Sequence, residues 1–88
     1  MTYKEKNNDK IYYCKKVKTA IKRAIKDNII DLQEDFGGDM EDIINLAEEN
    51  GEYKDFWEIK EDNTFFRFNI EILDEGTIYI HLGYRLLN

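Results

Sequence analysis

The stretch TFFRFNIEILDEGTIYIHLGYRLL, residues 64–87, decides the fold. On either side of residues 74–76 its apolar side chains alternate with polar ones, which is the period of two half-buried strands. A three-residue turn there, with Gly76 in the left-handed conformation, pairs Leu73 with Thr77. A shift of one residue would turn every apolar side chain to the other face, so this register is strongly specified. The register pairs apolar residues along one face: Ile72 with Ile78, Ile70 with Ile80, and Phe68 with Leu82.

A third strand is predicted before this pair, from Phe56 onward. Trp57 and Ile59 alternate with charged residues, which again indicates a strand with one buried face. We expect a two-residue turn at residues 62 and 63, because Asp and Asn favour tight turns. This turn gives three pairs: Glu61 with Thr64, Ile59 with Phe66, and Trp57 with Phe68.

Two helices are predicted ahead of the strands. The first is expected to start at Asn8 or Asp9 and to end by residues 37–38, with a break at residues 27–28 that leaves one long helix or two shorter ones open. Segment 10–14, KIYYC, is rich in residues that favour strands, and a strand there is the alternative. The apolar stripe of the helix recurs at steps of three and four residues: Cys14, Val17, Ile21 and Ile25.

The second helix is short. Asp39 is expected to cap it, Glu41 and Asp42 to occupy its first turn, and Gly51 to end it. With the strands these helices predict an α+β fold of two layers, in which N-terminal helices pack on a three-stranded antiparallel β-meander in the order ααβββ. The 88 residues form one domain, 1–88, of which residues 1–8 are expected to be a flexible arm.

Composition restricts the functional classes. The net charge of −6 is unfavourable for a protein that binds nucleic acid or an anionic membrane through bulk charge, so direct nucleic-acid binding is not expected. There is no serine and one cysteine, Cys14, which we interpret as a buried hydrophobe in a cytoplasmic protein. His81 is expected opposite Asn69 on the outer face of the sheet, as a contact residue or an ordinary exposed one. We therefore predict no enzyme activity, no cofactor and no metal site, because a zinc site needs about four suitable ligands.

Charge is segregated along the chain. Residues 1–30 carry nine basic and three acidic residues, residues 31–62 carry two basic and thirteen acidic ones, and residues 63–88 carry two and three. The corresponding net charges are +6, −11 and −1. The basic residues of the first segment include Lys15, Lys18, Lys22 and Lys26, which form one stripe of the predicted helix.

The stretch EDFGGDMED, residues 34–42, is the densest part of the acidic segment. It does not fit a calcium-binding EF-hand, since a loop starting at Asp35 has Gly37 at position 3 and Met40 at position 6. Capping and first-turn positions explain some of these acids, and the remaining interpretations are a solvated surface or a partner-binding surface. On the second helix, Glu41, Glu48, Glu49 and Glu52 are expected to share the outward side. The predicted partner-binding residues are Asp35, Asp39, Glu41, Asp42, Glu48, Glu49, Glu52 and Asp55.

In size, cysteine content and the acidic segment from Asp31 to Asp62, the chain resembles the small inhibitors of phages and mobile elements, among them anti-CRISPR proteins and other DNA mimics. The resemblance implies a non-enzymatic inhibitor whose acidic, DNA-mimicking surface binds a basic bacterial protein that processes nucleic acid, with a CRISPR effector as the first expectation. An antitoxin or immunity protein that blocks a nuclease is the alternative.

Three other roles of the charged and aromatic surfaces remain open. The basic first helix could bind nucleic acid as a small regulator. It could instead neutralise the acidic segment within the molecule. The outer face of the sheet, with Phe65, Tyr79 and Phe56, could form a homodimer contact.

Overall fold

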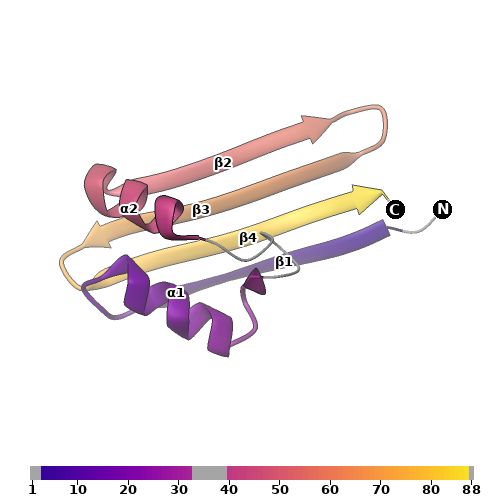
Figure 1. Cartoon of the computed structure of the whole chain (residues 1–88). Coiled ribbons are helices and arrows are strands. Elements are labelled where there is room, and N and C mark those ends of the chain that lie inside the picture. Colours follow the sequence, from indigo (N-terminus) through magenta and orange to yellow (C-terminus); the bar gives the residue numbers. More distant parts are fainter. Residues whose placement is uncertain (1–2, 33–39, 88) are drawn as a thin grey trace.

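The structure is a computed structural model and describes residues 3–32 and 40–87. Its four strands form one antiparallel sheet in the order β1-β4-β3-β2, and both helices lie on the same face of that sheet (Figure 1). The α+β class is confirmed, whereas the predicted three-stranded ααβββ arrangement is wrong. The elements in chain order are β1 (Tyr3–Tyr12), α1 (Val17–Lys26), α2 (Glu41–Asn50), β2 (Glu52–Ile59), β3 (Thr64–Asp74) and β4 (Thr77–Leu87).

The additional strand is β1, at the edge of the sheet beside β4. Residues 3–8, expected in a flexible arm, and the residues expected to begin the first helix all pair with β4, from Tyr3 opposite Leu87 to Tyr12 opposite Ile78. The sequence did not indicate this strand because residues 4–10 are all polar, and of its two last residues Ile11 is exposed and Tyr12 is buried. The alternative of a strand at KIYYC was therefore nearer to the structure, and pairing with β4 overrides the weak helical pattern.

The pairing of β3 with β4 confirms the predicted core register. Phe68 lies opposite Leu82, Ile70 opposite Ile80, and Ile72 opposite Ile78. The turn differs in one detail: Asp74, rather than Leu73, pairs with Thr77, and the register is irregular between Ile72 and Asp74. Gly76 has φ +97°, the left-handed conformation that the turn requires.

The pairing of β2 with β3 is shifted by two residues from the prediction. Ile59 pairs with Thr64, and Trp57 pairs with Phe66 and stacks on its ring at a centroid distance of 6.0 Å. The connection is a four-residue turn, residues 60–63, with Asn63 at φ +52° and its amide bonded to the Lys60 carbonyl. A shift of two residues keeps every side chain on its own face, so the apolar pattern alone could not detect it.

Helix α1 is shorter than predicted and begins at Val17. It ends at Lys26, and Asn28 follows with φ +63°, so the break expected at residues 27–28 is confirmed. Helix α2 ends as predicted at Gly51, which has φ +80°. The predicted cap Asp39 and the glycines at 37 and 38 lie outside the described residues. Neither described helix is long and apolar enough to cross a membrane.

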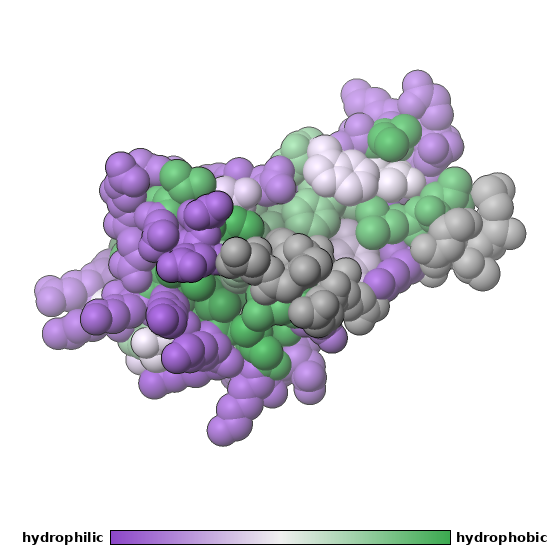
Figure 2. Space-filling model, viewed as in Figure 1, coloured by the Kyte–Doolittle hydropathy of each residue, from purple (hydrophilic) through white to green (hydrophobic). Residues whose placement is uncertain are grey.

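The two helices cover only part of the sheet. A ten-residue helix is about 15 Å long, whereas an eleven-residue strand extends about 36 Å. Figure 1 shows both helices over the half of the sheet where β2 begins and β3 ends. Hydrophobic residues appear on the surface between the helices and along the other half of the sheet (Figure 2). The core between the layers is formed by side chains of both helices, β3 and β4, among them Val17, Ile21, Ala47, Phe68, Ile70 and Leu82.

A polar contact joins β1 to the end of α1. Lys10 Nζ and Tyr12 Oη both donate hydrogen bonds to Asp27 Oδ2, at 2.9 and 3.0 Å. These bonds hold the pKa of the Asp27 carboxyl below its usual value. Burial, with the Asp27 hydrogen bond and charge, raises the pKa of Tyr12 to about 12. The contact therefore stabilises the ionised form of Asp27 beside a neutral Tyr12.

We predict that Asp27→Asn destabilises the protein near neutral pH and has little effect in acid. The folded pKa of Asp27 lies below its ordinary value of 3.8, so its stabilising effect is complete above that value and is lost as pH falls through the folded pKa. The measurement is urea unfolding of the wild type and D27N from neutral pH to acid. A difference in unfolding free energy that stays constant over this range would contradict the prediction. Tyr12→Phe, which removes one of the two donors, should raise the pKa of Asp27.

Candidate functional site

The segregation of charge along the chain becomes a segregation in space. Residues 3–26 carry nine basic and two acidic residues, net +7, and residues 40–62 carry two basic and nine acidic residues, net −7. The first set lies on β1 and α1, and α1 packs over β1 and β4. The second set lies on α2 and β2, and α2 packs over β2 and β3. The molecule therefore has a basic edge, β1 with α1, and an acidic edge, α2 with β2.

Two carboxylates of α2 point away from the body of the protein. Asp42 and Glu49 are seven residues apart, which is two helical turns, so they lie on the same side of α2 about 10.5 Å apart along its axis. Both are exposed. In the described part of the chain neither carboxylate forms an ion pair or a side-chain hydrogen bond. Of the predicted site residues, these two best fit a surface available to a partner.

Glu48 has a structural contact that the sequence did not indicate. Its Oε1 accepts a hydrogen bond of 2.9 Å from the backbone N–H of Val17, the first residue of α1. Lys16, at the N-cap position of α1, makes no capping bond with its side chain. Glu48 therefore caps α1 from the neighbouring helix, where a carboxylate also favours the positive end of the helix dipole.

The two predicted residues beyond α2 lie in β2, on opposite faces of the sheet. Glu52, expected on the helix, lies on the face away from the helices, where its carboxylate and that of Glu71 flank the Lys54 ammonium at 3.1 and 3.2 Å. These two hydrogen bonds raise the pKa of Lys54. Asp55 is exposed on the face that carries the helices, opposite Phe68. The predicted site is thus divided among separate surfaces, and Asp35 and Asp39 lie outside the described residues.

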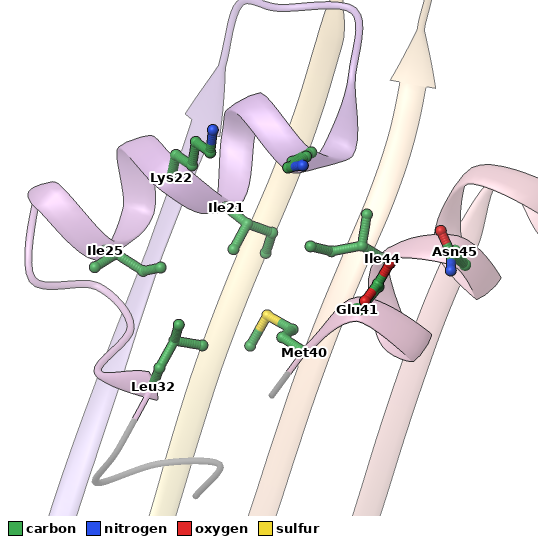
Figure 3. A pocket seen from close by; sticks show the side chains of 9 residues that line it. Ile21, Lys22, Ile25, Leu32, Met40, Glu41, Ile44 and Asn45 are labelled. Carbon is green, nitrogen blue, oxygen red and sulfur yellow. The ribbon is translucent and has the colours of Figure 1, made fainter. Parts of the chain in front are cut away.

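A groove of about 420 Å³ lies between the two helices (Figure 3). Its floor is apolar, with Ile21 and Ile25 from α1 and Ile44 from α2, and Lys22 and Glu41 stand at its rim. Sequence analysis placed Ile21 and Ile25 in the apolar stripe of the first helix and did not predict an opening between the two helices. None of the described residues that line the groove is a serine, cysteine or histidine, so they offer shape and charge rather than a nucleophile with its base.

Cys14 and His81 lie on different parts of the molecule. Cys14 is half-buried in the loop before α1, not on a helix, and its Sγ is 3.7 Å from the Lys16 carbonyl oxygen. His81 lies opposite Asn69, as predicted, and its Nε2 forms a hydrogen bond of 3.0 Å with Asn7 Oδ1 of the unforeseen strand β1. Gly83 leaves the space for this bond, since a Cβ there would lie 3.2 Å from Asn7 Oδ1. Within residues 3–32 and 40–87, no three His, Cys, Asp or Glu side chains form a group that could hold a metal ion.

We predict that Glu48→Ala lowers the free energy of unfolding by about 1 kcal/mol, because the first amide of α1 loses its acceptor. Glu48→Gln should cost less, since the amide oxygen can still accept the bond while the charge is lost. Glu49→Ala is the matched control on the adjacent residue and should change stability by less than about 0.5 kcal/mol. Urea unfolding measures all three variants. Equal losses for E48A and E49A would show that the contact with Val17 is not important for stability.

Comparisons with protein-family models, with curated protein sequences and with solved structures found no match. The features that bear on function are therefore those of the surface: the basic edge, the acidic edge with the outward carboxylates of α2, and the groove between the helices.

Proposed function

We propose that this chain is a non-enzymatic inhibitor, which binds a basic surface on a protein that processes nucleic acid. The observation that carries the proposal is the acidic edge, which faces away from the basic edge across a four-stranded sheet. Asp42 and Glu49 are exposed on α2, and among the described residues they form no ion pair, so they are the residues proposed to contact such a partner.

The electrostatics of this arrangement favour association with a cationic surface. Within residues 40–62 acids outnumber lysines by nine to two, so like charges repel one another along α2 and β2. A basic partner relieves this repulsion and is steered toward the acidic edge by its field. Surface charge of this kind allows α2 to occupy a channel that normally holds nucleic acid.

The partner class follows from the resemblance to small inhibitors of phages and mobile elements. On that basis we propose a bacterial nuclease or CRISPR effector, whose lysines and arginines supply the opposite charge. An antitoxin or immunity protein would use the same physics against the active site of a toxic nuclease. In both cases Glu48 contributes through the position of α1 and α2 rather than by direct contact, since its carboxylate already binds the Val17 amide.

The basic edge favours a second candidate function, the direct binding of nucleic acid. Lys18 and Lys22 are exposed on α1, and across the described residues neither lysine forms an ion pair. Lys18 and Lys22 therefore give no support to the other role considered for α1, in which its lysines neutralise the acidic segment within the molecule. A protein that uses this edge would bind DNA or RNA by itself, in a manner that weakens with salt.

The test is affinity capture from a bacterial lysate at low and high salt, followed by mass spectrometry. We expect the wild type to retain a basic nucleic-acid-processing protein at low salt, to release it at high salt, and to lose it to added double-stranded DNA. Replacement of Asp42 and Glu49 by lysine should abolish retention, because it reverses the charge of the outward side of α2.

The matched control replaces Asp74 and Glu75 by lysine, which changes the net charge equally in the exposed β3–β4 turn. Retention by the control variant with loss by the α2 variant supports the proposal. Equal retention by both variants, or equal loss, would contradict a specific role for α2. Recovery of nucleic acid that depends on Lys18 and Lys22 would support the second candidate instead.

A further inference from the structure

Strand β2 is an open edge of the sheet with unusual exposed apolar surface. In the described sheet it pairs with β3 on one side only, so its other side presents free backbone groups. Phe56, Trp57 and Ile59 are 58%, 41% and 46% exposed. These are three of the seven exposed large hydrophobic residues in the described chain, although β2 has only eight residues.

A fourth exposed apolar residue, Leu46, lies on the same side of the molecule. Successive residues of a helix are about 100° apart, so Leu46 lies about 160° around α2 from Glu48. Glu48 faces α1, as its bond to Val17 shows, and α1 lies on the β1 and β4 side of the sheet. Leu46 therefore faces the opposite way, toward the free edge of β2.

We propose that a second copy of this chain docks on this edge, with the two β2 strands paired antiparallel about a twofold axis at Phe56. The two sheets then continue as one eight-stranded sheet, with four helices on the same face. The pairing is formed by β2 and covers Asp55, whereas the proposed function rests on Asp42 and Glu49 of α2, so different variants test the two proposals.

The charge pattern of β2 is self-complementary in this register. With Phe56 opposite its copy, Lys54 of each chain lies opposite Glu58 of the other, and Glu52 lies opposite Lys60. Cross-strand pairs of opposite charge stabilise a sheet, and directly opposed like charges destabilise it. On the helix-bearing face the same register places Tyr53 opposite Ile59 and Asp55 opposite Trp57, so the exposed Trp57 and Ile59 of each copy each gain a neighbour from the other. The twofold axis makes every one of these pairs occur twice.

Neighbouring registers of the same symmetry lack this complementarity. A twofold axis at Asp55 places that carboxylate against its own copy and Glu52 against Glu58. An axis at Trp57 places Lys54 against Lys60. Directly opposite residues of two paired strands lie on the same face of the sheet. An axis midway between two neighbouring residues would pair residues of opposite faces, so those registers are excluded. The axis at Phe56 is also central to residues 52–60 and so gives the longest overlap.

The outer face adds an aromatic contact at the axis. Arg67 lies opposite Phe56 within the chain, and its guanidinium is 5.3 Å from the ring centroids of both Phe56 and Phe65. Pairing of the two Phe56 residues would place the group of Arg67, Phe56 and Phe65 in one copy beside the same group in the other. The other edge of the sheet is protected, since β1 carries Lys4, Lys6 and Lys10 on its helix-bearing face, and inward-pointing lysines prevent pairing at an edge.

The test uses the full-length chain and charge reversal at the Lys54–Glu58 pair. Sedimentation velocity should show a dimer of the wild type that dissociates on dilution through the micromolar range. Lys54→Glu and Glu58→Lys should each raise the dissociation constant by about tenfold or more, because each changes two symmetry-related pairs from attraction to repulsion. An equimolar mixture of K54E and E58K should form a dimer again, since both cross-strand pairs are then of opposite charge.

The matched controls make the same charge changes away from β2. Lys18→Glu on α1 and Asp74→Lys at the β3–β4 turn should leave the dimer within about twofold of the wild type, as expected for sites outside the paired β2 strands. Circular dichroism checks that each variant is folded. A second set, Glu52→Lys with Lys60→Glu, tests the outer pair by the same rescue in mixture.

The proposal is overturned if the wild type is a monomer throughout this range, or if K54E and E58K dimerise as well as the wild type. It is also overturned if their mixture does not dimerise, or if assembly continues beyond two copies, which would indicate pairing of β2 with β1 of the next molecule. These results are distinct from failure of the proposed function, which is read from the retention of a basic protein by the Asp42 and Glu49 variants and not from the oligomeric state.

Discussion

The pairing of β3 with β4 is the constraint on which the rest of the structure depends. Phe68, Ile70, Ile80 and Leu82 are fully buried on one face of this pair. That face has to be covered, and the apolar sides of two ten-residue helices cover it over half of its length. The free long sides of the pair take β1 and β2, which are more polar and become the two edges of the sheet. The positions of the helices and of the two edges of the sheet follow from this central pair.

The strand order converts a linear charge pattern into a spatial one. The basic first part of the chain lies beside β4 and the acidic middle part beside β3, so two central strands separate the opposite charges. Glu48 is an exception among these acids, because its carboxylate accepts a hydrogen bond from the first amide of α1. The acidic edge is therefore both a surface and part of the support that positions α1. Charge reversal on α2 has to spare Glu48 if binding and stability are to be distinguished.

Sequence reasoning identified the elements with strong periodicity. The β3–β4 register, both helices and the left-handed glycines 51 and 76 follow from local pattern and turn chemistry. Strand β1 was missed because Lys, Glu and Asn alternate there without an apolar face, so only its partner strand reveals it. The β2–β3 register was wrong by two residues, a shift that leaves the faces unchanged. At the candidate site, exposure of Asp42 and Glu49 was predictable from the helix, while the contact of Glu48 and the groove depend on how two helices meet.

The position of β1 also has a consequence for the order of folding. The ion pair between Glu5 and Arg85 joins residues 80 apart in the chain, and the strands that carry them lie side by side (Figure 1). On the ribosome β1 has no partner until β4 has emerged, whereas β3 and β4 are joined by a short turn and can pair at once. Closing the longest loop last is the expected order, because its entropy has to be lost before the pairing compensates for it. Pulsed hydrogen exchange would detect this as late protection of the β1 amides, and early protection there would contradict it.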